Sequence, residues 1–286
     1  MTGAVSRRSL LFGLPAAARA RLDASPPPDP VAAWEAGDYG VFGRRLEPAA
    51  EPIVRESAAG PGRRLLDLAA GDGNVALAAA RAGADVVAVD LAPRLVASGR
   101  ARSEAAGLAV DWRVGDAGSL PLEDAGFDCV ASSFGIIHAR DTRRVVDELD
   151  RVLRPGGVAL VTAWASAGLM GRVLRLAAEV EGRGPGDARP EWWGRYEGVQ
   201  LAFSRFAGFE ARDLTLRWRF ESADQLWDEL AAPPGPLAGA AARGEGARER
   251  LMQLVEPFAR REEGHLVLDV GYLMVVAHKP EWAAGA

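Results

Sequence analysis

The stretch from Arg64 to Ala78 constrains the fold more than any other part of this 286-residue chain. It begins with a short apolar run, Arg64-Leu-Leu-Asp-Leu, and continues through Gly71 and Gly73 into an alanine-rich segment. Glycine accepts backbone conformations that a Cβ atom forbids, so this pattern predicts a buried strand, a sharp turn and the start of a helix. In that geometry free backbone N–H groups point into the crevice above a parallel sheet, where nucleotide-like ligands bind. The segment therefore predicts a cofactor site.

A second apolar segment, shortly beyond the glycine turn, ends in a carboxylate. Asp85-Val-Val-Ala-Val-Asp90 is rich in β-branched residues and is predicted to be the next strand. A carboxylate at the end of that strand can accept hydrogen bonds from both ribose hydroxyls of an adenosine. Because Gly71-x-Gly73-x-x-Ala76 also satisfies the dinucleotide-binding pattern, these two segments indicate an adenosine ligand without deciding whether it is NAD or another adenosine compound.

Segments farther along the chain separate these alternatives. They are Ala109–Val114, Gly115-Asp116-Ala117, Leu120-Pro121, Phe127-Asp128-Cys-Val and Arg151-Val-Leu-Arg-Pro-Gly-Gly157. In order and spacing they resemble the class I S-adenosylmethionine (SAM)-dependent methyltransferases, particularly the small-molecule type related to ubiquinone and menaquinone biosynthesis enzymes. The resemblance spans about Trp34 to Lys279. A nicotinamide dehydrogenase has no reason to carry the turn at residues 151–157, so SAM is favoured over NAD.

The resemblance implies an α/β fold with a doubly wound, Rossmann-like sheet. Seven strands are expected, mostly parallel with one antiparallel strand near the C-terminus, together with N-terminal and inserted helices that cover the active site. A single SAM-binding domain is predicted for residues 31–282. Helical insertions are expected at about 166–206 and about 223–261.

The resemblance also assigns residues to the cofactor. They are Tyr39, Asp67, Ala69, Gly71, Gly73, Asp90, Leu91, Asp116, Ala117 and Ser133. The backbone of the glycine turn would cradle the methionine end of SAM, Asp90 would hold the ribose, and Asp116 would accept from the adenine amino group. Asp67 would lie beneath the turn. After methyl transfer, the bound product would be S-adenosylhomocysteine. Asp72 is interpreted as an exposed acid of the turn.

Two histidines are candidate catalytic residues. His138 follows the fourth predicted strand, and a neutral imidazole there could take a proton from a phenolic or hydroxyl acceptor at neutral pH. The alternative is that His138 packs against the helix beginning near Asp141, or lines the pocket without proton transfer. His265, in the turn before the closing strand, is a weaker candidate, since an exposed loop position explains it as well.

The predicted acceptor pocket is aromatic. Its candidate residues are Trp34, Trp164, Trp192, Trp193 and Tyr196. Such surfaces suit a flat or apolar small molecule, methylated on oxygen, nitrogen or carbon, in secondary or cofactor metabolism. Aromatic residues in a helical insertion are at least as often plain core. A second function also stays open, in which a protein of this fold binds SAM without transferring methyl, either assisting another reaction or acting as a ligand-binding partner.

Composition narrows the partners. A net charge of −5 and a pI near 5.4 argue against nucleic acid, whose binding needs clustered basic surface. Cys129 is the single cysteine and the three histidines lie far apart in sequence, so no metal site is expected. No segment is apolar and long enough to insert into a membrane. A small-molecule acceptor is therefore the expected partner, with a homodimer possible.

The first thirty residues are expected to be a flexible tail that ends in a proline-rich linker. Ser6-Arg7-Arg8 resembles the start of a twin-arginine export signal, but the apolar run after it is short and is interrupted by Pro15. Because SAM is made and kept in the cytoplasm, an exported SAM enzyme would lack its cofactor. A cytoplasmic protein is therefore predicted.

Overall fold

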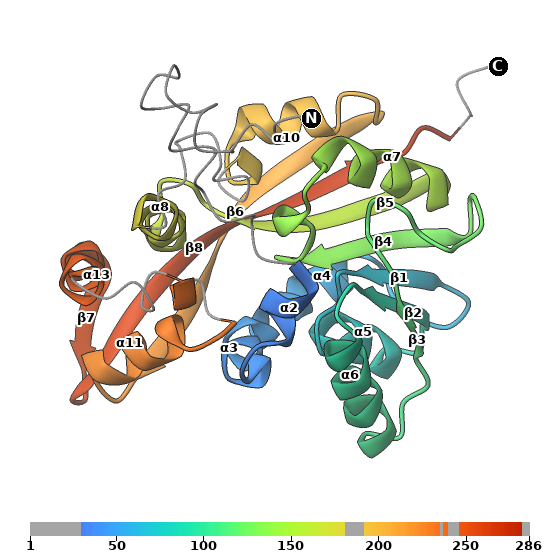
Figure 1. Cartoon of the computed structure of the whole chain (residues 1–286). Coiled ribbons are helices and arrows are strands. Elements are labelled where there is room, and N and C mark those ends of the chain that lie inside the picture. Colours follow the sequence, from blue (N-terminus) through green and yellow to red (C-terminus); the bar gives the residue numbers. More distant parts are fainter. Residues whose placement is uncertain (1–29, 181–191, 235–236, 240–245, 282–286) are drawn as a thin grey trace, which may run out of the picture.

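The computed structural model describes residues 30–180, 192–234, 237–239 and 246–281. Within these residues one sheet dominates the molecule (Figure 1). Its strands are β1 (Arg64–Leu68), β2 (Asp85–Asp90), β3 (Asp111–Val114), β4 (Phe127–Ser133), β5 (Leu153–Trp164), β6 (Gly208–Phe220), β7 (Ala259–Glu262) and β8 (His265–His278). Of the predicted tail, residues 1–30, residues 1–29 lie outside the described part of the chain, and Pro30 begins α2.

Helices connect and cover these strands. The α-helices are α2 (Pro30–Glu35), α3 (Tyr39–Leu46), α4 (Ala50–Glu56), α5 (Asn74–Arg81), α6 (Pro93–Ala105), α7 (Thr142–Val152), α8 (Leu169–Val180), α10 (Tyr196–Ala202), α11 (Ala223–Ala231) and α13 (Ala247–Val255). The 3₁₀ turns are η1 (Glu47–Ala49), η2 (Ile136–His138) and η3 (Glu256–Phe258). Helices α5 and α6 contact the β1–β3 part of the sheet, and α7 contacts β5.

The sheet order is β3-β2-β1-β4-β5-β8-β6. Strands β1 to β5 pair in parallel, whereas β8 runs antiparallel to both β5 and β6. The mostly parallel sheet with one antiparallel strand near the C-terminus is therefore confirmed. Because the carboxyl ends of parallel strands meet at one edge, the loops after β1, β2, β3 and β4 converge there.

Strand β7 is an addition to the expected seven strands and pairs with β8. Residues 259–261 lie in this strand, although the sequence pattern predicted that the last helix would continue to Arg261. Pro257 lacks a backbone N–H and its ring clashes with the preceding turn, so α13 ends at Val255. Glu263 and Gly264 both have positive φ, which closes the short β7–β8 hairpin.

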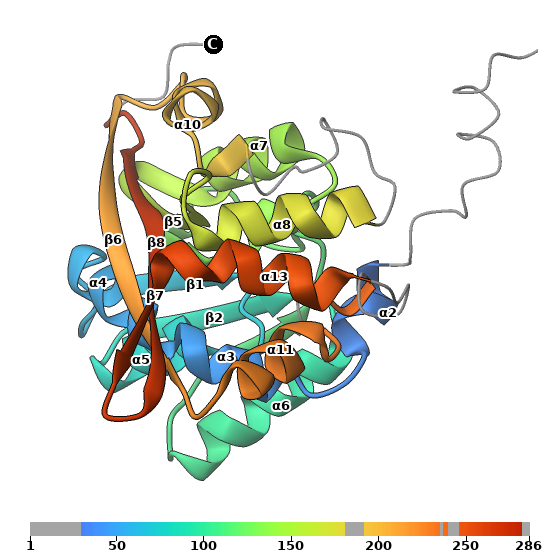
Figure 2. The same ribbon diagram turned by 90° about the vertical axis from the view of Figure 1, so that its left-hand side faces the viewer.

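Three helices of the second half, α8, α11 and α13, lie together on one side of the molecule, whereas α10 contacts α7. Figure 2 shows α8, α13 and α11 side by side, with α3 close to α11, and residue contacts join each neighbouring pair. The first predicted insertion, 166–206, contains α8 and α10, and α10 ends at Ala202. None of the helices in the described ranges is long and apolar enough to cross a membrane.

Candidate functional site

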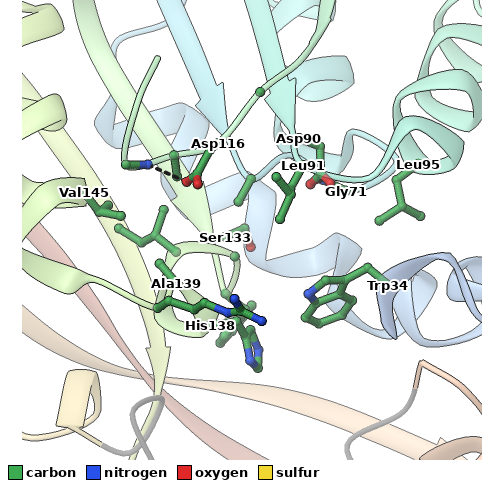
Figure 3. Close-up of a pocket in the computed structure, with 18 of the residues that line it drawn as sticks. Trp34, Gly71, Asp90, Leu91, Leu95, Asp116, Ser133, His138, Ala139 and Val145 are labelled. Atoms are coloured by element: carbon green, nitrogen blue, oxygen red, sulfur yellow. Dashed lines mark hydrogen bonds between the residues drawn. The ribbon is translucent and has the colours of Figure 1, made fainter. Parts of the chain in front are cut away.

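A cavity of about 320 Å³ lies at the carboxyl ends of the parallel strands. The loops after β1, β2, β3 and β4 form one side of it, and α2 and α3, the N-terminal cover, form another (Figure 3). Eight predicted cofactor residues line it: Tyr39, Ala69, Gly71, Asp90, Leu91, Asp116, Ala117 and Ser133. Two predicted acceptor residues, Trp34 and Trp164, and His138 line the same cavity.

The glycine turn after β1 shapes the floor of the cavity. Ala69, Gly71 and Gly73 all have positive φ, of 54°, 58° and 94°. A Cβ at Gly73 would lie 2.6 Å from the ring of Trp112, so only glycine fits between the turn and that side chain. Gly73 therefore shapes the turn from below without lining the cavity.

Asp90 is fixed at the end of β2. Its Oδ2 accepts from the backbone N–H of Gly71 at 2.8 Å, and its Oδ1 accepts from that of Ala92 at 2.9 Å. Burial raises the pKa of this carboxyl, although the two backbone hydrogen bonds act in the opposite direction. Asp90 thus joins β2 to the glycine turn and faces the cavity beside it (Figure 3).

Asp67 lies beneath the turn and does not line the cavity. Its Oδ2 accepts from the backbone N–H of Ala76 at 2.8 Å, at the start of α5. Burial raises the pKa of Asp67 to about 7, which the hydrogen bond from Ala76 partly opposes. The residue therefore orders the turn from below, and its charge changes near neutral pH.

This carboxyl predicts a pH dependence of stability. An acid whose folded-state pKa of about 7 exceeds its ordinary 3.8 stabilises the fold while protonated, and this contribution is lost as pH rises through 7. From pH 6 to pH 8 the unfolding free energy of the wild type should fall by about 1.4 kcal/mol more than that of Asp67→Asn. Urea unfolding at both pH values measures the difference. Equal slopes in the two proteins would contradict the assigned burial effect.

Asp72 was interpreted from the sequence as an exposed acid, and that interpretation is wrong. Its residue surface is 7% exposed, and Oδ1 lies 2.8 Å from Nη1 of Arg102. Burial raises the pKa of Asp72, whereas Arg102 lowers it. Arg102 also hydrogen-bonds Asn74, which in turn donates to the carbonyl of Gly43 in α3 at 2.8 Å. The turn is therefore tied to the N-terminal cover.

Tyr39 begins α3 and reaches the glycine turn. A Cβ at Gly71 would lie 3.0 Å from the Tyr39 hydroxyl, so the phenol rests directly against that backbone. Burial, and then the carboxylates Asp72 and Asp90, raise the pKa of Tyr39. The hydroxyl thus stays protonated and available as a hydrogen-bond donor at neutral pH.

An ion pair that sequence reasoning missed holds α3 in place. Nε and Nη2 of Arg45 donate to both carboxylate oxygens of Glu229 in α11, at 2.7 and 2.8 Å. Nη1 donates to the carbonyl of Arg219 at 2.7 Å, and the guanidinium lies 3.8 Å from the centre of the Phe220 ring. Such a two-pronged contact fixes direction as well as distance, so it positions the N-terminal cover. No sequence signal links these residues, because they lie far apart along the chain.

Asp116 and Ser133 border the cavity on the other side. Oδ1 of Asp116 accepts from the backbone N–H of Gly118 at 2.8 Å, the dashed line of Figure 3. Ser133 ends β4, and its Oγ is buried with no hydrogen-bond partner in the described structure. A buried hydroxyl without a partner is rare, so Ser133 Oγ is suited to a ligand atom in the cavity.

His138 lies at the cavity mouth opposite Trp34. The two rings, from η2 and α2, make an edge contact with their centres 5.0 Å apart (Figure 3). His265 is not among the cavity residues. At the start of β8 its Nε2 lies 3.2 Å from a carboxylate oxygen of Glu221, and its Nδ1 contacts Arg219. The structure thus brings one of the two candidate histidines to the cavity.

Three predicted acceptor residues do not line the cavity. Trp193 is fully buried and packs against Trp192 and Phe203. Tyr196 is 58% exposed and contacts Phe209 at the start of β6. Trp193 therefore agrees with the core alternative, whereas Tyr196 lies on the surface of the insertion.

Other apolar residues complete the cavity and were not singled out from the sequence. They are Phe42, Leu46, Leu95, Phe134, Ile136 and Val145. Phe134 directly follows Ser133, so its place after the fourth strand was the available signal. Among the described residues no group of three or more His, Cys, Asp or Glu side chains could hold a metal ion.

The fold is that of a Rossmann-like α/β protein, with a cavity where such folds bind their ligands. A family model described as a methyltransferase domain matches residues 66–161. An uncharacterized protein of Mycobacterium tuberculosis is 36% identical over 256 residues, which cover 87% of this chain and 93% of that protein. The chain belongs to the class I SAM-dependent methyltransferase family.

The chain is also similar to a curated methyltransferase and, in its fold, to a solved one. A demethylmenaquinone methyltransferase of Thermus thermophilus is 40% identical over 118 residues, which cover 40% of this chain and 54% of that enzyme. A solved N-methyltransferase of Haemonchus contortus, in complex with phosphomonomethylethanolamine and S-adenosylhomocysteine, superposes with a TM-score of 0.55. It is 20% identical, over 84% of this chain and 57% of that one, so the likeness concerns the fold.

Proposed function

We propose that this protein transfers a methyl group from SAM to a small apolar or aromatic metabolite, on oxygen, nitrogen or carbon. The proposal rests on one observation: the same cavity is lined by polar groups on one part and by aromatic side chains on another. Asp90, Asp116 and the glycine turn supply polar groups for an adenosine, while Trp34 and Trp164 supply aromatic surface. The methyltransferase family membership and the names of the relatives support the same reaction.

The residues present fit SAM. The backbone of Ala69 and Gly71 would hold its methionine end, Asp90 its ribose hydroxyls, and Asp116 its adenine amino group, with the Ala117 N–H at the ring. Ser133 Oγ, which has no hydrogen-bond partner among the described residues, would provide a further polar contact at the same wall. When bound, SAM supplies a methyl group that its sulfonium already activates.

The protein's part in such a reaction is placement. Transfer needs the acceptor atom in line with the S–CH₃ bond, and both reactants shielded from water. The N-terminal cover supplies the shielding through Trp34 and Tyr39, and the Arg45–Glu229 pair holds that cover down. His138, which lines the cavity, would take the proton from a hydroxyl acceptor.

The test is production of S-adenosylhomocysteine. Purified protein is incubated with methyl-labelled SAM and fractionated small-molecule extracts, and label transfer and S-adenosylhomocysteine are followed together. Equal amounts of both products are expected with fractions that contain the acceptor. SAM binding without either product in any fraction would contradict methyl transfer and favour a protein that uses bound SAM in another way.

A further inference from the structure

The loop that follows β4 carries a bulky side chain on an unusual backbone. Phe134 has φ of 57°, in the left-handed region that glycine occupies readily and large residues avoid. Such conformations persist where the surrounding structure imposes them, and they cluster at functional sites. A glycine at this position would remove the strain, so the phenylalanine ring is retained at a conformational cost.

Three contacts impose this backbone. The N–H of Phe134 donates to Oγ1 of Thr162 at 3.0 Å, and the N–H of Ile136 donates to Oγ of Ser132 at 3.1 Å. Gly135 packs closely against the backbone of the glycine turn after β1, since a Cβ at Gly135 would lie 2.4 Å from the carbonyl oxygen of Ala69. These contacts hold the loop, and with it the ring, at the cavity.

The ring itself is backed by other aromatic side chains. It stacks on Trp164 with centres 3.9 Å apart and planes 18° apart, and its edge contact with Tyr272 has centres 5.4 Å apart. Trp164 in turn contacts Trp218 at 5.9 Å between ring centres. Phe134 and Trp164 line the cavity although each is nearly buried, which places the stack at the inner end.

Space in this cavity is limited. Small-molecule sites usually span ~300–1,000 Å³, and the volume of about 320 Å³ is at the lower limit. The cavity must receive both donor and acceptor, so each ring at its inner end restricts the acceptor.

We propose that Phe134 is the specificity-determining residue for the acceptor: its stack on Trp164 closes the inner end of the cavity and restricts the protein to single-ring acceptors. The inference rests on the proposed function and adds the size class of the substrate.

The test measures binding of two neutral phenols in the presence of S-adenosylhomocysteine. p-Cresol represents one ring and 9-phenanthrol three fused rings. By calorimetry, Phe134→Gly is expected to bind 9-phenanthrol about tenfold more tightly than the wild type does, with p-cresol affinity changed by less than about threefold. Phe134→Leu, which keeps an apolar side chain against Trp164, should show a smaller change in the same direction and carries the test where the glycine variant does not fold.

Phe127→Leu is the matched control, because Phe127 is a buried phenylalanine of β4 that does not line the cavity. It should lower the melting temperature without changing the ratio of the two affinities. An unchanged ratio in the folded Phe134 variants, or no binding of 9-phenanthrol to them, would overturn the inference. The wild type failing to bind S-adenosylhomocysteine in the same titrations would instead contradict the proposed function.

Discussion

Replacing Asp90 with alanine is expected to weaken SAM binding by about 1.5–3 kcal/mol, since hydrogen bonds to charged groups contribute this much. The change removes a carboxylate that would accept from both ribose hydroxyls. It also removes the acceptor of the Gly71 and Ala92 N–H groups, which fixes the turn against β2. Isothermal titration calorimetry with SAM, S-adenosylhomocysteine and NAD measures the effect, and NAD should bind neither protein.

Asp85→Ala is the control for this experiment. Asp85 is at the other end of β2, exposed, with its Oδ2 3.3 Å from Nε of Arg64. Since it lies away from the cavity, SAM affinity should stay at the wild-type value. If the Asp90→Ala and Asp85→Ala variants bind SAM with equal affinity, Asp90 is excluded from the cofactor site.

The second large effect concerns turnover. If His138 takes the acceptor proton, His138→Ala should lower kcat by roughly 10²–10⁴, the usual contribution of general acid–base catalysis, with SAM affinity nearly unchanged. The ring lines the cavity mouth and contacts Trp34 through its edge, so it is placed to reach an acceptor. Steady-state kinetics with the acceptor found by the labelling experiment, together with SAM titrations, separate the two quantities.

His265→Ala is a matched control, because this second histidine lies outside the cavity beside Glu221. Its turnover should equal that of the wild type. A merely packing role for His138 has a different signature, namely a lowered melting temperature with turnover reduced only a fewfold. That outcome would show that His138 does not take the proton. It would not affect the proposal that Trp34 and Trp164 supply aromatic surface for the acceptor.

The cofactor half of the site could be predicted because its signals are local. Strand, glycine turn and terminal carboxylate follow one another in sequence, so the sequence alone places Gly71 and Asp90 at the same crevice, and a hydrogen bond joins them in the structure. The prediction of helix at residues 259–261 is wrong. The sequence pattern of a short hairpin strand resembles that of a helix end, and only the helix-breaking effect of Pro257 distinguishes them here.

The acceptor half depends on contacts between distant segments. The sequence predicts a pocket from the aromatic residues Trp192, Trp193 and Tyr196. Aromatic residues in an insertion also form its core, and only the tertiary packing shows which of the two roles they have. The sequence predicts a surface acid at Asp72, because nothing near it in sequence indicates the ion pair that the fold forms with Arg102 of α6. Arg45 and Glu229 belong to helices with no common pattern, so their pairing follows from the fold alone.

The position of β8 has a consequence for how the chain is made. This last strand lies between β5 and β6 in the sheet. During synthesis β6 leaves the ribosome first and, among the described strands, pairs only with β8. The nascent chain must therefore hold a long unpaired strand edge until residues 265–278 emerge, which is the kind of species that chaperones protect from aggregation. Without residues 265–278, β6 and β7 would have no pairing strand among the described strands and β5 would keep only β4, so truncations that remove β8 are expected to yield insoluble protein.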